Sequence, residues 1–418
     1  MKIKNYEKLG ETLYTDVLPN GLTVYYLPKA DFHKTYGLFT TNFGSLDVRF
    51  DETTYPEGIA HFLEHKLFEK ADGDVMYKFG ALGADTNAFT SFNRTAYLFS
   101  TVENVADCTE LLLDFVQEPY FTAENVEKEQ GIITQEIQMY QDEPDWRLYA
   151  GLLAALYPNS PLAADIAGTP TSIGEITAEM LYTNHQAFYQ PANMNLFLTG
   201  NFEINEISEL VRKNQAKKEF QASKLPRRAV FLPSAAITCG ELTLDVAQPK
   251  VAFGLRGETK ISDVFDYRLA LQLFLALNFG KTSAFYQENY AAGTLDDSFS
   301  YELEMDGSGR FHCIIFSCDT ENPENFVKIL KNALKNYKIE PEKLALIKKQ
   351  MLGAHFASLN SLEYIANEFA AMPAASDKTI FEFPEVLAQL TAEKIAQFSE
   401  NFLKNAQESQ FQIIPKIK

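Results

Sequence analysis

Cysteine, histidine, basic residues and long apolar runs are all scarce in this 418-residue chain. Its four cysteines form no Cys-x-x-Cys pair, which is typical of small buried hydrophobes in a reducing compartment and disfavours a cysteine-based metal or redox motif: Cys108, Cys239, Cys313 and Cys318. The longest apolar stretch, residues 269–279, is too short to span a bilayer, and residues 1–16 contain no apolar run like the core of a secretion signal. We therefore expect a soluble, cytoplasmic protein.

The shortage of basic residues, 37 against 56 acidic ones, leaves a formal charge of -19. This balance disfavours binding to nucleic acids or anionic membranes, because phosphate backbones and acidic lipids would be repelled. An acidic protein could attract basic peptides, although acidity also simply keeps a protein in solution.

The content of 46% hydrophobic and 22% charged residues is that of an ordinary globular protein. Since the length exceeds one compact core, we expect two domains of about two hundred residues each.

Two of the six histidines, His61 and His65, lie in one short segment, residues 55–68 (YPEGIAHFLEHKLF), which has helical periodicity. On a helix, positions i, i+3 and i+4 share one face, so His61, Glu64 and His65 would point into the same small volume. Two imidazoles with a carboxylate between them are typical of a metal site with a base beside it. The alternative is a pair of histidines on a buried helix face, satisfied by hydrogen bonds.

A second helix, predicted over residues 122–143, carries carboxylates where apolar residues are expected. Glu129 and Glu136 fall on the same face as an apolar seam formed by Val126, Ile133, Ile137 and Tyr140. Carboxylates on such a seam are costly unless they are paired or coordinated. A third metal ligand and a hydrogen-bond acceptor for a ligating histidine would account for both glutamates. A polar rim or a buried salt bridge is the alternative.

Residues 169–202 and 390–416 share one plan of loop, helix and strand, in which Phe188 matches Phe402 and Phe197 matches Phe411, each 214 residues further on. The match predicts an α+β chain of two structurally related halves, with domains over residues 1–216 and 234–418 and a polar linker over 217–233. At the same offset, the His-x-x-Glu-His segment meets residues 275–279 (LALNF), and Glu136 meets Gln350. We therefore expect the metal site only in the first half.

Four segments together resemble the inverted-zincin metallopeptidases, the family of pitrilysin, insulinase and the mitochondrial processing peptidase. They are HFLEH (61–65), EKEQGIITQEIQMY (127–140), ADTNAFTSFNRTAY (84–97) and IAGTPTSIGEIT with YQPANMNLFLTGNF (166–202). The resemblance covers the whole chain, is specific in the first half and architectural in the second, and is strongest to paired bacterial members of about this length. It implies that each half is a mixed β-sheet faced by helices, and that the chain forms half of a peptidase clamshell.

The resemblance also assigns the site residues. His61, His65 and Glu136 would bind one Zn2+ per chain, Glu129 would orient a ligating histidine, and Glu64 would be the general base of a zinc-dependent endopeptidase acting on peptides or small unfolded proteins. The segment Asn87, Ala88 and Phe89 would be an edge strand to which the peptide adds, with Asn87 contacting the peptide backbone. An ordinary hairpin strand is the alternative for these last three residues.

One feature of the family has no match in the second half. Active members carry an Arg and a Tyr that bind substrate, but residues 282–299 (TSAFYQENYAAGTLDDSF) have Tyr290 and Ala292 where the arginine is expected and Asp296 near the tyrosine position. We therefore expect a heterodimer with a homologous chain that lacks zinc and supplies this pair, with a homodimer as the alternative. A non-catalytic structural or scaffold subunit is the alternative function. A metal-storing protein would give no reason for Glu64 to lie between the histidines.

Overall fold

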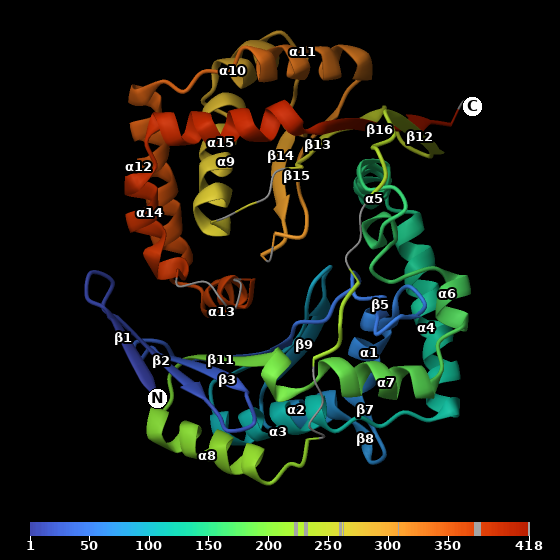
Figure 1. Ribbon diagram of the computed structural model, residues 1–418, viewed down its shortest axis with the longest axis vertical. Coiled ribbons are helices and arrows are strands. Elements are labelled where there is room, and N and C mark those ends of the chain that lie inside the picture. The colour runs from blue at the N-terminus through green and yellow to red at the C-terminus, as the bar shows by residue number, and fades with distance from the viewer. Residues whose placement is uncertain are drawn as a thin grey trace. The chain divides into compact units, whose positions relative to one another are not determined.

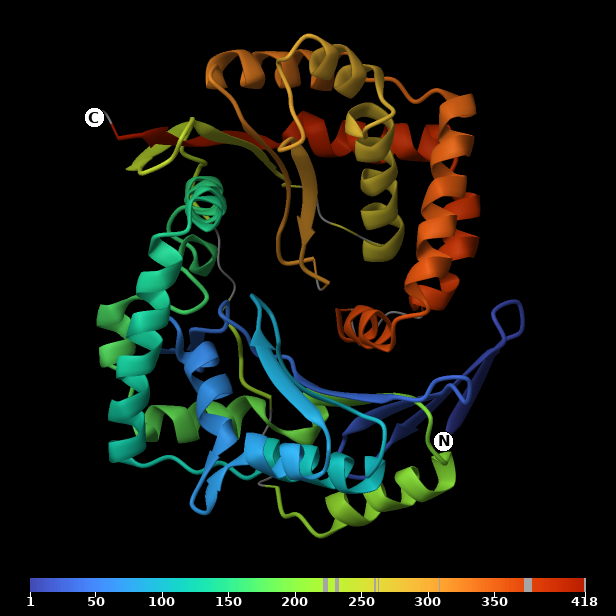
Figure 2. The same ribbon diagram turned by 180° about the vertical axis from the view of Figure 1, so that it is seen from behind.

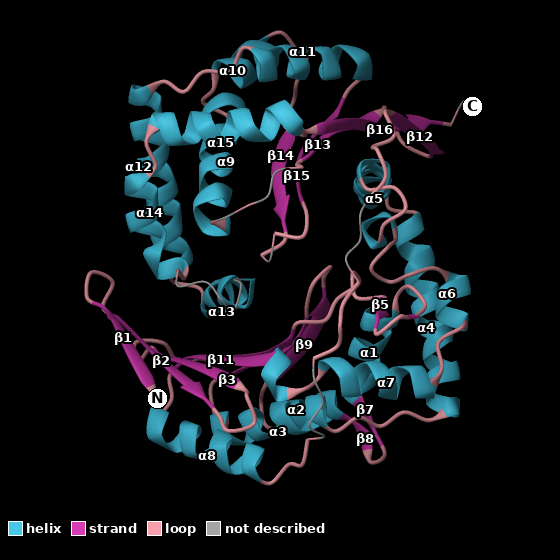
Figure 3. Ribbon diagram, viewed as in Figure 1, coloured by secondary structure: helices cyan, strands magenta, loops and turns pink. Residues whose placement is uncertain are grey.

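The computed structural model describes residues 1–220, 225–229, 233–258, 261, 263–307, 309–371 and 378–416. They form two compact units (Figure 1). Unit 1 comprises Met1–Ile137, Asp165–Val230 and Ser358–Ala371, and unit 2 comprises Gln138–Ala164, Phe231–Ala357 and Met372–Lys418. Each unit is a mixed β-sheet faced by helices (Figure 3), which confirms the predicted α+β class with two related halves.

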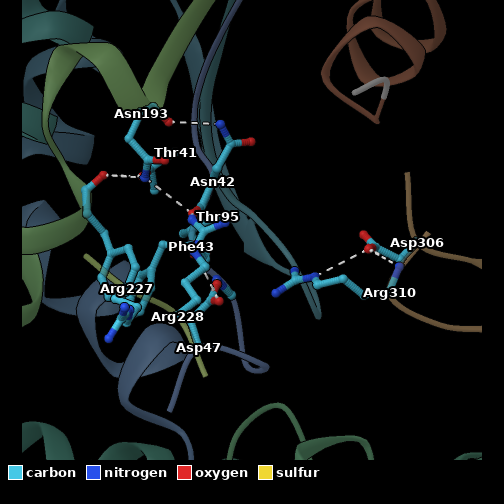
Figure 4. Close-up of polar contacts among 12 residues, drawn as sticks. Thr41, Asn42, Phe43, Asp47, Thr95, Asn193, Arg227, Arg228, Asp306 and Arg310 are labelled. Carbon is cyan, nitrogen blue, oxygen red and sulfur yellow. Dashed lines mark hydrogen bonds and ion pairs between the residues drawn. The ribbon is translucent and has the colours of Figure 1, made fainter. Parts of the chain in front are cut away.

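The predicted division into residues 1–216 and 234–418 stays a prediction, but the compact units differ from it in two segments. Residues 138–164 belong to unit 2, and residues 358–371 belong to unit 1. The predicted linker, 217–233, lies partly outside the described residues. Residues 228 and 229 of this linker are held by unit 1, where the Ala229 N–H donates to the Arg49 carbonyl at 3.0 Å and Arg228 lies 3.3 Å from the buried carboxylate of Asp47 (Figure 4).

Unit 1 is built on a seven-stranded sheet in which only β3 and β11 are parallel neighbours. In spatial order its strands are β1 (Lys2–Tyr6), β2 (Glu11–Val17), β3 (Thr23–Pro28), β11 (Met194–Gly200), β4 (Thr35–Thr41), β10 (Thr95–Thr101) and β9 (Asp85–Thr90). An Asn20-Gly21 turn joins β2 to β3, with Gly21 at a φ of 92° that favours glycine. The interior strand β4 is buried along its whole length, whereas β9 lies at one edge.

Helices cover one face of this sheet and supply most of the core of unit 1 (Figure 1). They are α1 (Ile59–Phe68), α2 (Val75–Ala81), α3 (Val105–Gln117), α4 (Ala123–Gln141), α6 (Pro170–Gly174), α7 (Ala178–Phe188) and α8 (Ile204–Ala216). Short connections complete the unit, namely the hairpins β5 (Arg49–Phe50) with β6 (Thr53–Thr54) and β7 (Glu69–Lys70) with β8 (Gly73–Asp74), and the 3-10 turn η2 (Pro191–Asn193). The helix predicted over residues 122–143 corresponds to α4.

The other face of the sheet is covered by α13 (Leu362–Ala371), which packs on β4 and β11 (Figure 2). Side chains alternate between the two faces of the sheet along β11, and both faces are buried. Leu196 and Leu198 belong to the core under the helices, while Phe197 points to the opposite face. There the ring of Phe369 lies 4.6 Å from that of Phe197 and 5.9 Å from that of Tyr25. Unit 1 therefore needs a helix that comes late in the sequence.

Unit 2 repeats the same strand order in a five-stranded sheet. Its strands are β12 (Cys239–Leu244), β16 (Gln407–Pro415), β13 (Lys250–Arg256), β15 (His312–Asp319) and β14 (Ser300–Met305), with only β12 and β16 parallel. One face carries the core formed with helices α9 (Val264–Phe279), α10 (Ala284–Ala291), α11 (Pro323–Lys335), α12 (Pro341–Ser358), α14 (Phe383–Gln389) and α15 (Ala392–Asn405). The shared order β3-β11-β4-β10-β9 and β12-β16-β13-β15-β14 agrees with the two structurally related halves that the sequence repeat predicts.

The opposite face of this sheet is covered by α5 (Pro144–Leu156), which is followed by the 3-10 turn η1 (Pro161–Ala163). The helix approaches closely because glycines line the contact: a Cβ on Gly151 would lie 2.4 Å from the Phe411 ring, and one on Gly254 would lie 2.7 Å from Leu156. The turn η3 (Ile380–Glu382) precedes α14. On the face opposite its main helical core, each sheet is thus covered by a helix from the other half of the sequence.

Two expectations about apolar runs and cysteines can be compared with the structure. No helix in the described part of the chain combines the length and hydropathy needed to cross a membrane. All four cysteines are free, and three are buried as expected. The expectation was wrong for Cys239, which is exposed because it begins β12, the strand at one edge of its sheet.

Candidate active site

The site helix α1 begins directly after its N-cap residue Gly58, whose backbone has a φ of 88°. A side chain could not be placed there, because a Cβ would lie 2.4 Å from the Ala167 carbonyl oxygen. From this start the apolar residues of α1 face the core, with Ile59, Phe62 and Leu63 fully buried. Their packing fixes the rotation of the helix, so that His61, Glu64 and His65 face α4 and β9 together.

The three predicted ligands converge. The ligand atoms of His61, His65 and Glu136 all lie within 4.8 Å of one another, and no other such group of histidine, cysteine, aspartate or glutamate occurs among the described residues. Nε2 of His61 is 3.8 Å from one carboxylate oxygen of Glu136, and Nε2 of His65 is 3.5 Å from the other. Two imidazole nitrogens and one carboxylate oxygen around a common point are the donor set of catalytic zinc sites.

Glu129 lies seven residues before Glu136 on α4 and contacts Nδ1 of His65, the ring nitrogen on the far side from Glu136. Nδ1 of His65 lies 3.1 Å from Oε1 of Glu129 and donates to it, which leaves the Nε2 lone pair directed at the ligand group. The other oxygen, Oε2, lies 3.5 Å from Nζ of Lys66, a fully buried side chain that also contacts Glu69. Burial alone would raise the pKa of Glu129, but the hydrogen bond from His65 and the charge of Lys66 lower it.

Lys66 was not foreseen from the sequence, although a signal was present. On α1 it follows Ile59, Phe62 and Leu63 at helical spacing, so it falls on the apolar seam rather than on a solvated face. A lysine on such a seam requires a buried acidic partner, because an unpaired buried charge is very costly. The same reasoning that singled out the seam glutamates of α4 would have predicted this partner.

The two histidines differ in their electrostatic surroundings. Burial and, to a smaller extent, the neighbouring His65 together lower the pKa of His61 to about 3, so its imidazole is neutral near pH 7. Burial acts in the same direction on His65, but the hydrogen bond to Glu129 and the charge of Glu64 outweigh it and raise the pKa. Nδ1 of His61 is buried with no hydrogen-bond partner among the described residues. The alternative of two histidines satisfied by hydrogen bonds therefore does not hold for His61.

Glu64 is the buried carboxyl beside the ligand group, with 8% of its surface exposed. Its Oε2 accepts a hydrogen bond of 2.7 Å from the Thr90 hydroxyl on β9. Burial raises the pKa of Glu64, against the lowering effect of that hydrogen bond and of His65. A carboxyl with a raised pKa next to a candidate metal site is suited to proton transfer near neutral pH.

The predicted substrate strand is β9 itself. Asn87, Ala88 and Phe89 pair with β10 on one side, and β9 is the last strand in the order of its sheet. Asn87 is exposed, and the ring of Phe89 is stacked under the guanidinium of Arg94 at 5.5 Å. The edge position agrees with the expectation, while a contact of these residues with substrate stays a prediction.

The second half carries no counterpart of the ligand group among its described residues. Leu275 and Phe279 of α9 are buried core residues, and Gln350 lies on α12. Leu275 and Gln350 instead line a cavity of about 630 Å3 in unit 2. Tyr290 is exposed on α10.

Comparison with known proteins agrees with this class of fold and site. The family description "Insulinase (Peptidase family M16)" matches residues 42–170, and "Peptidase M16 inactive domain" matches residues 175–351. The uncharacterized zinc protease YmfH of Bacillus subtilis is 41% identical, covering 98% of each chain, and an uncharacterized zinc protease of Rickettsia felis is 27% identical over 93% of this chain and 94% of its own. The crystal structure of a putative M16-like peptidase from Alicyclobacillus acidocaldarius superposes with a TM-score of 0.90 and 33% identity, covering 97% of this chain and 99% of that one. The chain belongs to the insulinase family, peptidase family M16, as the resemblance predicted.

Proposed function

We propose that this chain is the zinc-bearing subunit of a cytoplasmic endopeptidase that hydrolyses peptides or small unfolded proteins inside a dimeric clamshell. The observation that carries the proposal is the convergence of His61, His65 and Glu136 within 4.8 Å, with the buried Glu64 beside them. One Zn2+ per chain fits this donor set, and the neutral imidazole of His61 needs no deprotonation to bind it. The zinc proteases among its relatives support the same function.

The roles of the protein groups follow from their positions. Bound zinc would act as a Lewis acid on the scissile carbonyl and would lower the pKa of the attacking water. Glu64 takes the proton from that water and returns it to the leaving amine. The free edge of β9 at residues 87–89 holds the peptide as an added strand, and Asn87 contacts its backbone. Glu129 keeps His65 in the tautomer that presents Nε2.

The activity is tested on the purified chain, with metal analysis, a peptide-cleavage assay and a chelator. We expect one zinc per chain, loss of cleavage with chelator and its return with Zn2+. Glu64→Gln should retain zinc and lower kcat by a factor of at least about 100, because the base is removed while the ligands remain. The matched control is Glu127→Gln on the exposed side of α4, which should behave as wild type. A Glu64→Gln variant with wild-type cleavage would refute the proposal.

We also propose that a second, homologous chain without zinc completes the enzyme by supplying an Arg and a Tyr. Residues 282–299 contain no arginine. The superposition with the crystal structure of pitrilysin covers 99% of this chain but only 46% of the pitrilysin chain, with a TM-score of 0.77 at 16% identity. The pitrilysin chain is therefore long enough to contain a second half of similar size. Copurification with a tagged chain, followed by cleavage assays with and without the partner, tests this. Full activity of the isolated monomeric chain would contradict it, and a self-associated active chain would favour the homodimer.

A non-catalytic structural subunit is the second candidate. The fold alone is shared with a chain of complex III2 from Candida albicans, with a TM-score of 0.76 at 13% identity over 96% of this chain. Metal content separates the two candidates. A chain purified without zinc, together with a Glu64→Gln variant that keeps its role in the cell, would favour the structural subunit.

A further inference from the structure

The strand that carries the predicted peptide-binding segment also touches the predicted base. Thr90 is the last residue of β9 and follows directly on Asn87, Ala88 and Phe89. Because side chains alternate along a strand, Asn87 and Phe89 point to one face of the sheet, while Ala88 and Thr90 point to the helical face, toward α1. One short strand thus presents a backbone edge outward and a hydroxyl to Glu64.

The contact between Thr90 and Glu64 is short and shielded. The Thr90 hydroxyl donates to Oε2 of Glu64 at 2.7 Å, across 26 positions of sequence. Among the residues that the structure describes, no other hydrogen bond reaches the Glu64 side chain, so its Oε1 accepts none. A buried carboxylate with a single donor has its orientation set by that donor.

We propose that Thr90 is a positioning residue for catalysis: its hydroxyl occupies Oε2 of Glu64, leaves Oε1 for proton transfer, and ties the orientation of the base to the strand that holds the peptide. The inference rests on the proposed function, because it gives Glu64 the role of base. It adds a group that touches neither zinc nor substrate. A displacement of a reacting group by about 1 Å can cost about 100-fold in rate.

The test compares three variants on the same strand. Thr90→Val keeps the branched shape and removes the hydroxyl, and Thr90→Ser keeps the hydroxyl. Thr86→Val is the matched control, since Thr86 lies on the same face of β9 but donates to the Leu98 carbonyl at 2.8 Å instead of to Glu64. We expect Thr90→Val to lower kcat by about 10- to 100-fold with KM changed less than twofold, Thr90→Ser to recover most of the rate, and Thr86→Val to match wild type.

A readout independent of turnover is zinc affinity, measured by competition with a chromophoric chelator. Thr90→Val should bind zinc like wild type, because the hydroxyl does not contact the ligand group. If Thr90→Val does not fold, Thr90→Ala is measured in its place, since it removes the hydroxyl without adding a methyl group.

Four results would overturn the inference. They are wild-type kcat in Thr90→Val, equal losses in Thr90→Val and Thr86→Val, failure of Thr90→Ser to recover the rate, and a loss of zinc affinity in Thr90→Val. Glu64→Gln is assayed in parallel to separate the two proposals. If Glu64→Gln is inactive while Thr90→Val is fully active, only the role of Thr90 falls. If Glu64→Gln is active, both the proposed function and the role of Thr90 are wrong.

Discussion

The buried lysine of the site helix offers a sharp test of the electrostatics. Lys66 has no exposed side-chain surface, and its ammonium contacts Glu69 and lies 3.5 Å from Oε2 of Glu129. Lys66→Met keeps the length and the apolar contacts of the side chain but removes the charge. Glu129 then retains only the hydrogen bond from His65.

The magnitude follows from the exposure of the two acidic partners. Breaking a buried ion pair by removing one member costs about 3 to 5 kcal/mol, because the other charge stays buried. Glu69 has 35% of its side chain exposed, so water replaces the ammonium there and this contact contributes about 1 kcal/mol at most. Glu129 has 11% exposed and keeps one of its two partners. We therefore expect Lys66→Met to lower the free energy of unfolding by about 3 kcal/mol.

The assay is urea denaturation of the metal-free protein, because bound zinc would add a stabilisation of its own. Unfolding is followed by circular dichroism, since the only tryptophan, Trp146, lies in unit 2 and would not report on the region of Lys66. The control is Lys78→Met, in which a half-exposed lysine loses its surface pair with Asp72, and no measurable change is expected. A Lys66→Met variant within about 1 kcal/mol of wild type would show that this charge does not compensate Glu129.

Two further predictions concern other parts of unit 1. Glu129→Gln should weaken zinc binding by about 10- to 100-fold in a chelator competition, because His65 loses its carboxylate acceptor, while Glu127→Gln should leave it unchanged. His185 is buried and donates to the Val116 carbonyl, and burial lowers its pKa from 6.5 to about 4. Between pH 6.5 and about pH 4 the unfolded chain therefore binds more protons at His185 than the folded chain does. The contribution of His185 to the free energy of unfolding is fully present above pH 6.5 and falls by up to about 3 kcal/mol as the pH is lowered toward 4. His185→Gln should flatten this part of the pH profile of unfolding, and an unchanged slope would contradict the assignment.

Much of the candidate site could be predicted from helical spacing alone. His61, Glu64 and His65 share a face because of their separation by three and four residues, and the two glutamates of α4 were conspicuous on an apolar seam. Thr90 could not be found in this way. Its contact with Glu64 joins a strand to a helix, and no local pattern says which residue of β9 meets which residue of α1.

The fold was predictable to the level of two related α+β halves. The sequence repeat indicates the common strand order, because matched segments occupy matched places in the two sheets. Periodicity does not say which sheet an amphipathic helix covers, so the exchange of α5 and α13 was not foreseen. The apolar face of α13, with Leu362, Ile365 and Ala366 buried, would fit any exposed apolar surface, and only tertiary packing selects β4 and β11.

The position of α13 also has a consequence for the order of synthesis. A nascent chain that has left the ribosome as far as residue 230 has every strand of the first sheet, yet it has no cover for the face that bears Tyr25 and Phe197. That aromatic surface remains open until Phe369 has been translated. Because exposed apolar surface attracts chaperones and promotes aggregation, we expect both at this surface during the interval. Separate expression of the first half, ended at the linker, would make the interval permanent.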